Sequence, residues 1–468
     1  MQLKQTNTQV VIVGAGYSGI AAAKRLYEKN IDFIVLEARN RIGGRVLTHS
    51  IRPGLHVELG AQWIGPEHDH DLMYEWIREA DFHTFDTFDH EFNIYEFEGR
   101  QSLYTSAEEG PDMIPFSRFV FKAGLILADV IAKFAWRYFP NDISRLLDKY
   151  TVQDFFNMIK PIMGRSYYGI NKGFEISSAQ RGEDMSLLHA LFNIYTAGGF
   201  RKVIKVSGGA QQSIILEGAQ NLLFNIYAKF SDKIRLNQSV TGVDDRGTEV
   251  VISTATTSIS AKKIIMAIPP KQYEPIDFGG DDSFVNKKAL FEKLRLGTPI
   301  KCFAIYARPF WREKRPFYRK QALSGQVITD RHPFVASYDC SPGTRPGVLL
   351  FFVKEKTEGE FTSLTNEARK LLLVSQIVRL YGPEGHDIID YKDHIWDDKE
   401  EQWSGGGYAA SFPKGLWTES GTTFRSPTGN IHWAGTEMAT KWYGYMEGAI
   451  HAGYRAADEV SAAIGTAK

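Results

Sequence analysis

The sequence predicts an α/β protein in which segments of two domains alternate along the chain. A strand, a glycine-rich turn and a helix open the chain, and strand patterns return near residues 250–268 and 430–434 with helical patterns between them. The chain has 468 residues, of which 43% are apolar and 24% charged, which suits two or three globular domains. Disordered, collagen-like and rod-shaped proteins are excluded by this composition.

The first elements form one β-turn-α-β unit. Gln9–Val13 is a β-branched strand, Tyr17–Lys29 has the pattern of a helix, and Asp32–Leu36 is a second apolar strand. Short strands on both sides of one helix are typical of the parallel sheets of α/β proteins. We therefore expect a Rossmann-like domain at the start of the chain.

The turn of this unit reads Gly14-Ala15-Gly16-Tyr17-Ser18-Gly19. Its glycines allow a tight turn, and the start of the following helix offers free N–H groups to a pyrophosphate. Glu37 ends the second strand, where a carboxylate can accept hydrogen bonds from ribose hydroxyls. Together these features predict a dinucleotide site; a glycine turn with only a structural role is the alternative.

A second glycine loop, Arg39-Asn40-Arg41-Ile42-Gly43-Gly44-Arg45, follows directly. Two glycines between arginines let the backbone approach an anion, and Arg45 can make charge-assisted hydrogen bonds to it. The alternative is a basic turn exposed to solvent.

The helix expected over Phe119–Trp136 is unusually apolar. Its charged residues Lys122, Asp129 and Lys133 fall on one narrow stripe, and nearly every other position is apolar. We expect this helix to be buried on most sides within a helical lobe, in preference to lying on a membrane surface.

The rest of the chain contains further strand and helix patterns. Residues 143–200 look mostly helical, whereas residues 81–118 alternate aromatic and acidic residues without a clear period. A last helix is expected over Gly444–Ile464. Strands are expected at Val250–Ser253, Lys263–Ile268, Pro299–Tyr306, Val348–Val353 (buried on both faces) and Asn430–Ala434.

Charge and cysteine content exclude several classes of function. Lys plus Arg and Asp plus Glu both number 55, so the chain lacks the excess positive charge of a nucleic-acid-binding protein. Its two cysteines, Cys302 and Cys340, form neither a disulfide framework nor a zinc motif, and no metal is expected. Without a visible leader or membrane span, we expect a soluble, cytoplasmic protein with no membrane partner.

The segment Val35–Arg39, followed by Gly43-Gly44-Arg45, resembles the flavin-containing amine oxidases. The resemblance continues in order to the end of the chain and is weakest between residues 90 and 180. It is carried further by Glu58–Trp63, Lys233–Val243, Ala267–Pro270, Gly297–Cys302, Ser404–Tyr408, Trp433–Glu437 and Trp442–Gly448.

This resemblance implies a Rossmann-like FAD-binding domain interleaved with an α+β substrate-binding domain made of a mixed sheet and a helical lobe. The FAD domain would comprise residues 1–80, 205–270 and 395–468. The substrate domain would comprise 81–204 and 271–394, with the lobe at about 115–200.

Motifs and resemblance together imply a set of FAD-binding residues. Glu437 would accept hydrogen bonds from the ribityl chain, and the Met446 N–H, at a helix start, would face the pyrimidine edge of the flavin. Where covalent members carry a flavin-linking cysteine, this chain has Gly407, so we expect non-covalent FAD. The full set is Gly14, Gly16, Ser18, Gly19, Glu37, Arg39, Gly44, Arg45, Gly60, Ala61, Gln62, Trp63, Val240, Gly435, Glu437, Tyr445 and Met446.

Three residues are the catalytic candidates that the resemblance implies. Tyr408 and Tyr445 match the aromatic pair that flanks the substrate amine, and Lys301 matches a lysine that holds a water beside flavin N5. For either tyrosine, core packing is the alternative. Residues 61–65 lack the arginine that grips an α-carboxylate, which argues against an α-amino-acid substrate.

We therefore expect FAD-dependent oxidation of an amine to an imine, which water hydrolyses to a carbonyl, with O₂ reduced to H₂O₂. The alternatives are an amine dehydrogenase with a protein electron acceptor, a desaturase-like flavoprotein, and a non-catalytic flavin-bound interaction module. The sequence leaves open which amine is oxidised and whether the chain forms a homodimer.

Overall fold

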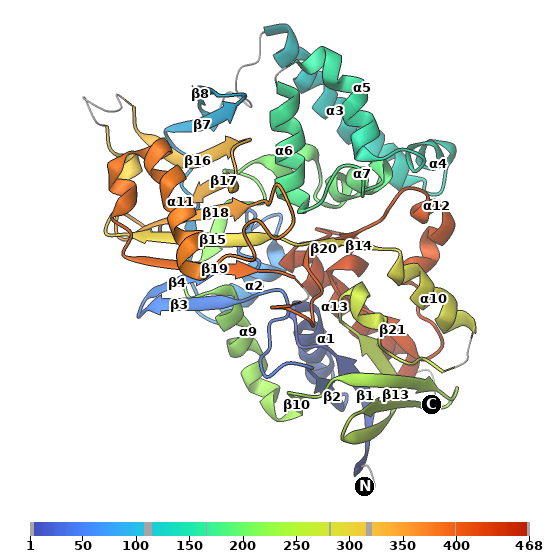
Figure 1. The fold of residues 1–468 in the computed structure, drawn as a ribbon. Helices are drawn as coiled ribbons and strands as arrows, with labels where there is room; N and C mark the ends of the chain where they lie inside the picture. The colour runs from blue at the N-terminus through green and yellow to red at the C-terminus, as the bar shows by residue number, and fades with distance from the viewer. Residues whose placement is uncertain are drawn as a thin grey trace.

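Two large sheets and a helical lobe make up the protein (Figure 1). The computed structural model describes residues 4–106, 115–164, 166–279, 282–314, 321–397 and 399–465. Each sheet takes its strands from separated stretches of the chain, so the predicted α/β fold with interleaved domains is confirmed. The exact domain boundaries stay a prediction.

The first sheet has the strand order β10-β2-β1-β13-β12-β11, and β21 pairs with the end of β13. β1 runs parallel to both β2 and β13, and helices α1 (Tyr17–Glu28) and α13 (Met446–Gly465) pack together beside it. The strands are β1 (Lys4–Val13), β2 (Phe33–Leu36), β10 (Ile234–Arg235), β11 (Val240–Asp245), β12 (Val250–Thr254), β13 (Thr257–Met266) and β21 (Ile431–Trp433).

Both faces of this sheet are covered. Val10 and Ile12 of β1 join the core that contains α1 and α13, whereas Val11 and Val13 join the core on the opposite face. Alternation along a strand therefore sends apolar residues to both sides, which explains the continuous β-branched run. The predicted elements of the opening unit are confirmed, and β1 extends further toward the N-terminus than expected.

The second sheet has the order β19-β15-β18-β17-β16-β7-β8 and is antiparallel except for the β16–β7 pair. Helix α11 (Asn366–Tyr381) packs on one face. Every residue of β18 is buried, as predicted for this segment. The strands are β7 (Phe92–Phe97), β8 (Arg100–Tyr104), β15 (Ile300–Tyr306), β16 (Leu323–Thr329), β17 (Phe334–Asp339), β18 (Gly347–Val353) and β19 (Asp390–Ile395).

Three small sheets lie near the two large ones. The β3–β4 hairpin places Leu55 and Val57 in one core with Phe303 and Leu350 of the second sheet. These small sheets are β3–β4 (Thr48–Arg52, Leu55–Glu58), β5–β9–β6 (Trp63–Ile64, Ser213–Ile215, Thr84–Asp86) and β14–β20 (Arg295–Gly297, Gly407–Ser411). The helices α2 (Asp71–Glu79), α9 (Ala219–Tyr227), α10 (Asp282–Glu292) and α12 (Leu416–Ser420) complete these layers.

Residues 81–104 hold β6, β7 and β8, which the sequence did not reveal. Five of the six residues of β7 are buried, polar Asn93 and Glu96 among them, so no alternation of polar and apolar residues marks this strand. Its strand character comes from its pairing with β16 and β8.

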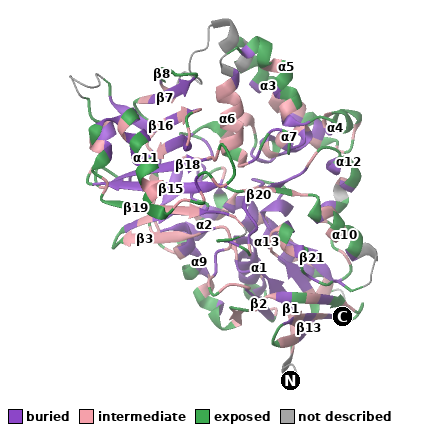
Figure 2. Ribbon diagram, in the orientation of Figure 1, coloured by how far each residue is buried: buried purple, intermediate pink, exposed green. Residues whose placement is uncertain are grey.

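The helical lobe confirms the prediction for residues 143–200 but not the expected burial of the helix before them. On α3, Ile126, Val130 and Phe134 are 61%, 55% and 55% exposed, whereas Ala132 and Ala135 are buried, so the prediction of burial on most sides is wrong (Figure 2). Helix α7 packs against α3, and the alanines of α3 are among its inward-facing residues. The lobe comprises α3 (Pro115–Arg137), α4 (Asp142–Leu147), α5 (Val152–Met163), α6 (Ser166–Ser178), α7 (Leu187–Thr196) and α8 (Phe200–Ile204).

Within the described parts of the chain, no helix is both long enough and apolar enough to cross a membrane.

Candidate active site

A large cavity extends from the glycine turn of the first sheet to Lys301 of the second sheet. It contains about 1310 Å³ of empty space, its open mouth included, above the roughly 300–1,000 Å³ typical of small-molecule sites. Of the predicted site residues, its lining includes Gly14, Gly16, Ser18, Glu37, Gly44, Arg45, Gly60, Ala61, Val240, Lys301, Tyr408, Gly435, Tyr445 and Met446. Gly19, Arg39, Gln62, Trp63 and Glu437 lie outside this lining.

The glycine turn brings helix α1 close to the end of β1. Gly14 has a φ of +99°, and Gly16 precedes the first turn of α1 at the cavity wall. Gly19 serves packing, because a Cβ on it would lie 1.9 Å from the carbonyl oxygen of Gly14. The open N-terminus of α1 is thereby directed at the cavity, as anion binding requires.

The Glu37 carboxylate lies at the cavity wall and fixes the shape of the turn. It is 6% exposed, and its oxygens accept hydrogen bonds from the backbone N–H groups of Ala15 (2.8 Å) and Arg39 (2.9 Å). Each carboxylate oxygen can accept a further bond, so Glu37 remains able to bind a ribose hydroxyl.

Arg39 is not part of the cavity lining and binds a buried acid. Its guanidinium pairs with Glu401 and bonds the carbonyl of Gly44 at 3.1 Å, and Arg41 pairs with the same carboxylate at 3.0 Å. Burial raises the pKa of Glu401, but a hydrogen bond from His394 and the charges of both arginines lower it overall. Glu401 was missed because nothing in the local sequence links it to a loop so distant along the chain.

Arg45 and Glu437 form a bidentate ion pair at the cavity wall. The two contacts measure 2.6 and 2.9 Å, and Arg45 also donates to the carbonyl oxygen of Tyr408 at 2.8 Å. Glu437 is 1% exposed and accepts a further bond from the Ala410 N–H. Its carboxylate thus holds Arg45 and β20 in place, and its predicted bond to a ribityl chain stays a prediction.

Lys301 points to the face of β15 opposite α11, because Cys302 and the other even-numbered residues occupy the α11 side. It is 3% exposed, and its ammonium donates to the carbonyl oxygens of Glu58 (2.6 Å) and Gly60 (2.9 Å) and to the side chain of Gln62. Burial lowers the pKa of Lys301, whereas the neighbouring Cys340 and Glu58 act to raise it. A buried cation with three oxygen acceptors fits a positioned catalytic group.

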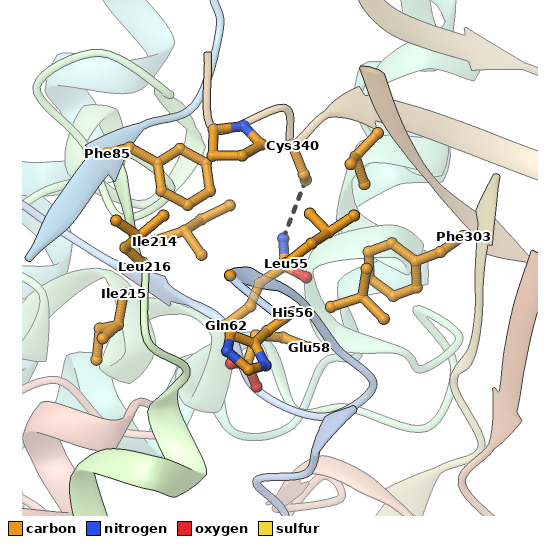
Figure 3. A pocket seen from close by; sticks show the side chains of 14 residues that line it. Leu55, His56, Glu58, Gln62, Phe85, Ile214, Ile215, Leu216, Phe303 and Cys340 are labelled. Atoms are coloured by element: carbon orange, nitrogen blue, oxygen red, sulfur yellow. Dashed lines mark hydrogen bonds between the residues drawn. The ribbon is translucent and has the colours of Figure 1, made fainter. Parts of the chain in front are cut away.

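A second, smaller cavity lies behind the partners of Lys301 (Figure 3). It contains about 410 Å³ of empty space, and Glu58 and Gln62 belong to its wall. The amide of Gln62 donates a hydrogen bond to the sulfur of Cys340 at 3.4 Å. Figure 3 draws this bond between the side chains of Ile214 and Phe303. Both Cys302 and Cys340 are free thiols, as predicted.

Tyr408 and Tyr445 line the main cavity and are each held through the backbone. Arg45 bonds the carbonyl of Tyr408, and the Thr436 hydroxyl bonds the carbonyl of Tyr445 at 3.0 Å. Burial raises the pKa of Tyr445 to about 12 and that of Tyr408 further, so both phenols stay neutral near pH 7. Two uncharged rings therefore border the cavity.

Aromatic side chains from β5, β17 and β18 gather beside Tyr408. Phe352 meets the Tyr408 ring edge-on at 6.2 Å, and Trp63 lies 5.9 Å from Phe352 and 5.1 Å from Tyr338. Trp63 thus belongs to this aromatic cluster, and its indole N–H bonds Thr87 at 3.1 Å. Tyr408 lines the main cavity, and Trp63, Tyr338 and Phe352 lie outside that lining and support its ring.

The start of α13 also lines the cavity. Gly444, with a φ of +86°, precedes Met446, the first residue of the helix, and both line the cavity. The helix start presents free N–H groups and positive dipole there. That the Met446 N–H faces a flavin stays a prediction. Glu447, left without a role by the sequence, accepts hydrogen bonds from the N–H groups of Leu72 and Met73 at the start of α2.

The amino-acid sequence of this chain matches known flavoenzymes. The family model described as flavin containing amine oxidoreductase matches residues 17–461. The flavin-containing amine oxidase B of Cavia porcellus is 30% identical over 467 residues, which cover 97% of this chain and 86% of that protein.

Solved structures agree on the fold. A double mutant of putrescine oxidase has a TM-score of 0.85 at 25% identity, covering 98% of this chain and all of that one. Cyclohexylamine oxidase from Brevibacterium oxydans IH-35A has a TM-score of 0.87 at 24% identity, covering 98% and 99% of the two chains.

Proposed function

This chain belongs to the family of flavin-containing amine oxidoreductases. We propose that it oxidises an amine with an apolar substituent in the part of the main cavity that Tyr408 and Tyr445 line. Oxidation of an amine with FAD is the activity of the family. The particular roles of the residues below, the use of O₂ and the non-covalent attachment of FAD are parts of this proposal. The observation that carries it is the pair of neutral rings, Tyr408 and Tyr445, on the cavity that also contains Lys301.

The residues of the cavity fit FAD. Gly16 and Gly44 leave backbone exposed at the turn, where a Cβ on either would meet no atom closer than 3.5 Å and would instead fill cavity space. The α1 N-terminus suits the pyrophosphate, Glu37 suits the ribose and the α13 N-terminus suits the electron-rich edge of the flavin. When bound there, FAD supplies an acceptor for the hydride of the amine's α-carbon.

The two tyrosines orient the amine. Only the neutral amine can release a hydride, so a site that stabilised the ammonium would oppose the reaction. Uncharged rings held by Arg45 and Thr436 can restrict the amine between their faces without a carboxylate that would keep it protonated.

Lys301 acts on the oxidative half of the cycle. Two carbonyl oxygens and Gln62 take all three N–H donors of the ammonium, which places a fixed positive charge beside the cavity. It can stabilise negative charge there, and it holds a water when one of these bonds, such as that to Gln62, is exchanged. We assign O₂ as the electron acceptor and Lys301 as the residue that speeds its reduction to H₂O₂.

Tyr408, against which the aromatic cluster of Trp63, Tyr338 and Phe352 packs, sets the substrate class. An apolar or aryl substituent would gain from contact with the Tyr408 ring in the cavity, whereas a second ammonium there would lose hydration beside an uncharged ring. Benzylamine and cyclohexylamine are therefore expected to be better substrates than a short diamine such as putrescine.

Anaerobic stopped-flow reduction tests the amine site. At saturating benzylamine, Tyr408→Ala and Tyr445→Ala are each expected to reduce at least about tenfold more slowly, and the double variant to lose less than the sum of the two effects. The matched Tyr→Phe variants keep the ring and should stay close to the parent. If both alanine variants reduce as fast as the parent with FAD fully bound, the rings have only a packing role.

Acid precipitation tests how FAD is attached. Gly407 offers no thiol at the position used by covalent members, and Gly407 and Tyr408 both line the cavity. We expect all yellow colour to remain in the supernatant after precipitation. Yellow protein in the pellet would contradict non-covalent binding.

A further inference from the structure

Helix α3 packs its small residues inward and turns its large ones to solvent. Ala132 and Ala135 are 1% and 0% exposed, whereas Ile126, Val130 and Phe134, spaced four residues apart, are all more than half exposed. A soluble helix normally has the reverse arrangement. Exposed apolar residues scattered singly need no explanation, but a continuous stripe of them marks an interaction surface.

The apolar stripe is broad. At 3.6 residues per turn, its members occupy an arc of about 120° on the helix. The described side chains of this arc that are large and exposed are Phe119 (70%), Ile126 (61%), Leu127 (58%), Val130 (55%) and Phe134 (55%), and Tyr138 (55%) continues it just past the helix end.

One edge of the same stripe is basic. Lys122, Lys133 and Arg137 are exposed and lie beside Ile126 and Val130 when the helix is viewed along its axis. Asp129 is the acidic residue among the described residues of this helix. It accepts a hydrogen bond at 2.7 Å from the N–H of Phe200, the first residue of α8. The exposed face of α3 therefore combines apolar bulk with positive charge.

Helix α5, which contacts α3, extends this surface. Phe155, Met158 and Ile162 follow the spacing i, i+3, i+7 and are 38%, 67% and 51% exposed, and the neighbouring Lys160 is exposed as well. Figure 2 shows exposed stretches on both helices at the outer end of the lobe. Apolar side chains interleaved with lysines thus recur on two adjacent helices.

We propose that α3 and α5 form a docking surface for an anionic lipid bilayer, with α3 lying in the plane of the interface. A broad apolar arc with a basic edge is the pattern of interfacial helices, whose apolar side enters the acyl region while the cations bind headgroup phosphates. This inference replaces the expectation that the protein has no membrane contact, and it is independent of the amine chemistry.

Charge distinguishes the bilayer from a second copy of the chain. A twofold interface through α3 would bring Lys133 and Arg137 of one copy near the same residues of the other, which costs energy in a desolvated contact. An anionic surface instead offers each cation a phosphate. The helix lies on the surface and does not insert across it, because no described helix meets the requirements for crossing a membrane.

Vesicle co-sedimentation of the FAD-loaded protein tests the proposal. The parent is expected to bind vesicles made of equal parts phosphatidylcholine and phosphatidylglycerol, and to bind pure phosphatidylcholine vesicles and high-salt samples much more weakly. Ile126→Ser/Val130→Ser/Phe134→Ser should lower the partition constant at least about tenfold. Lys122→Gln/Lys133→Gln/Arg137→Gln should lower it by roughly a hundredfold and abolish the salt dependence.

Leu371→Ser/Leu372→Ser/Ile389→Ser is the matched control, because these side chains are similarly exposed at 62%, 38% and 55% but lie outside the lobe. It should bind vesicles like the parent. All variants change exposed residues, so unchanged FAD content and thermal midpoint will show that they fold. The proposal is overturned if the parent does not bind anionic vesicles, or if the serine variant of α3 instead abolishes a concentration-dependent dimer in analytical ultracentrifugation.

Discussion

Helices α1 and α3 are both rich in apolar residues, yet their surroundings differ. Nine of the twelve residues of α1 are buried between the first sheet and α13, with Ala21, Ala22 and Ala23 all at 0% exposure. On α3, the alanines are buried and the large side chains face solvent. Apolar composition therefore predicts a helix, but the number of neighbouring elements decides how much of that helix is covered.

This contrast extends to the glycines of the two regions. Gly19 of α1 is in backbone contact with the glycine turn, whereas Gly173 of α6 in the lobe has no atom within 4 Å of where a Cβ would lie. Around the glycine turn, backbone segments lie so close together that a Cβ at Gly19 does not fit. In the lobe, the space beside Gly173 would accept a Cβ. Substitutions should therefore affect the two regions in opposite directions.

The largest effect is expected for Gly19→Ala. Its Cβ would overlap the Gly14 carbonyl oxygen, so we expect a loss of roughly 3 kcal/mol or more of unfolding free energy, together with weakened FAD binding. Gly173→Ala should instead stabilise the protein by about 0.5–1 kcal/mol through helix propensity. Chemical denaturation measures the unfolding free energy of each variant, and FAD titration measures its affinity for FAD. Equal effects of the two substitutions would contradict the difference in backbone packing between the two regions.

A smaller effect, confined to one step, is expected for Lys301→Met. Re-oxidation of the dithionite-reduced enzyme by O₂ should slow by about a hundredfold, while reduction by amine changes little, because the role we propose for the ammonium belongs to the oxidative half of the cycle. Lys24→Met is the control: Lys24 is also largely buried but pairs with Glu28 and Glu79 on the outer side of α1. Unchanged re-oxidation in Lys301→Met would remove this residue from the chemistry.

The effect that is smallest near neutral pH concerns the border between the two regions, where His189 of α7 stacks on Phe412 and accepts a hydrogen bond from the indole of Trp417. Burial, with the charge of Arg425, lowers the pKa of His189 from 6.5 to about 3. As the pH falls, His189 is protonated in the unfolded chain before it is protonated in the folded protein. The unfolding free energy should therefore decline below about pH 6.5 by up to about 1.4 kcal/mol per pH unit.

Thermal midpoints measured across that pH range test the assignment. His189→Gln should flatten the decline, whereas the exposed His386→Gln should leave it unchanged. An identical pH dependence in the parent and His189→Gln would show that other groups govern acid unfolding.

Much of the nucleotide side could be predicted from sequence because its determinants are local. The turn from Gly14 to Gly19 and the acid Glu37 lie within one β-turn-α-β unit, where strand, turn and helix follow one another without a partner from elsewhere. The cavity lining indeed includes Gly14, Gly16 and Glu37. Tyr408 and Tyr445 were located only through resemblance, because nothing in the local pattern of either distinguishes it from a core tyrosine.

Side-chain periodicity and backbone freedom over a few residues were enough to predict the opening β-turn-α-β unit and its glycine turn, and resemblance gave the order of the later site segments. Only the tertiary structure decided which side chains meet. It paired Arg39 with Glu401 and Arg45 with Glu437, and it left the large residues of α3 uncovered. Ion pairing and burial depend on segments hundreds of positions apart, and their free energy is fixed by the geometry in which the chain brings them together.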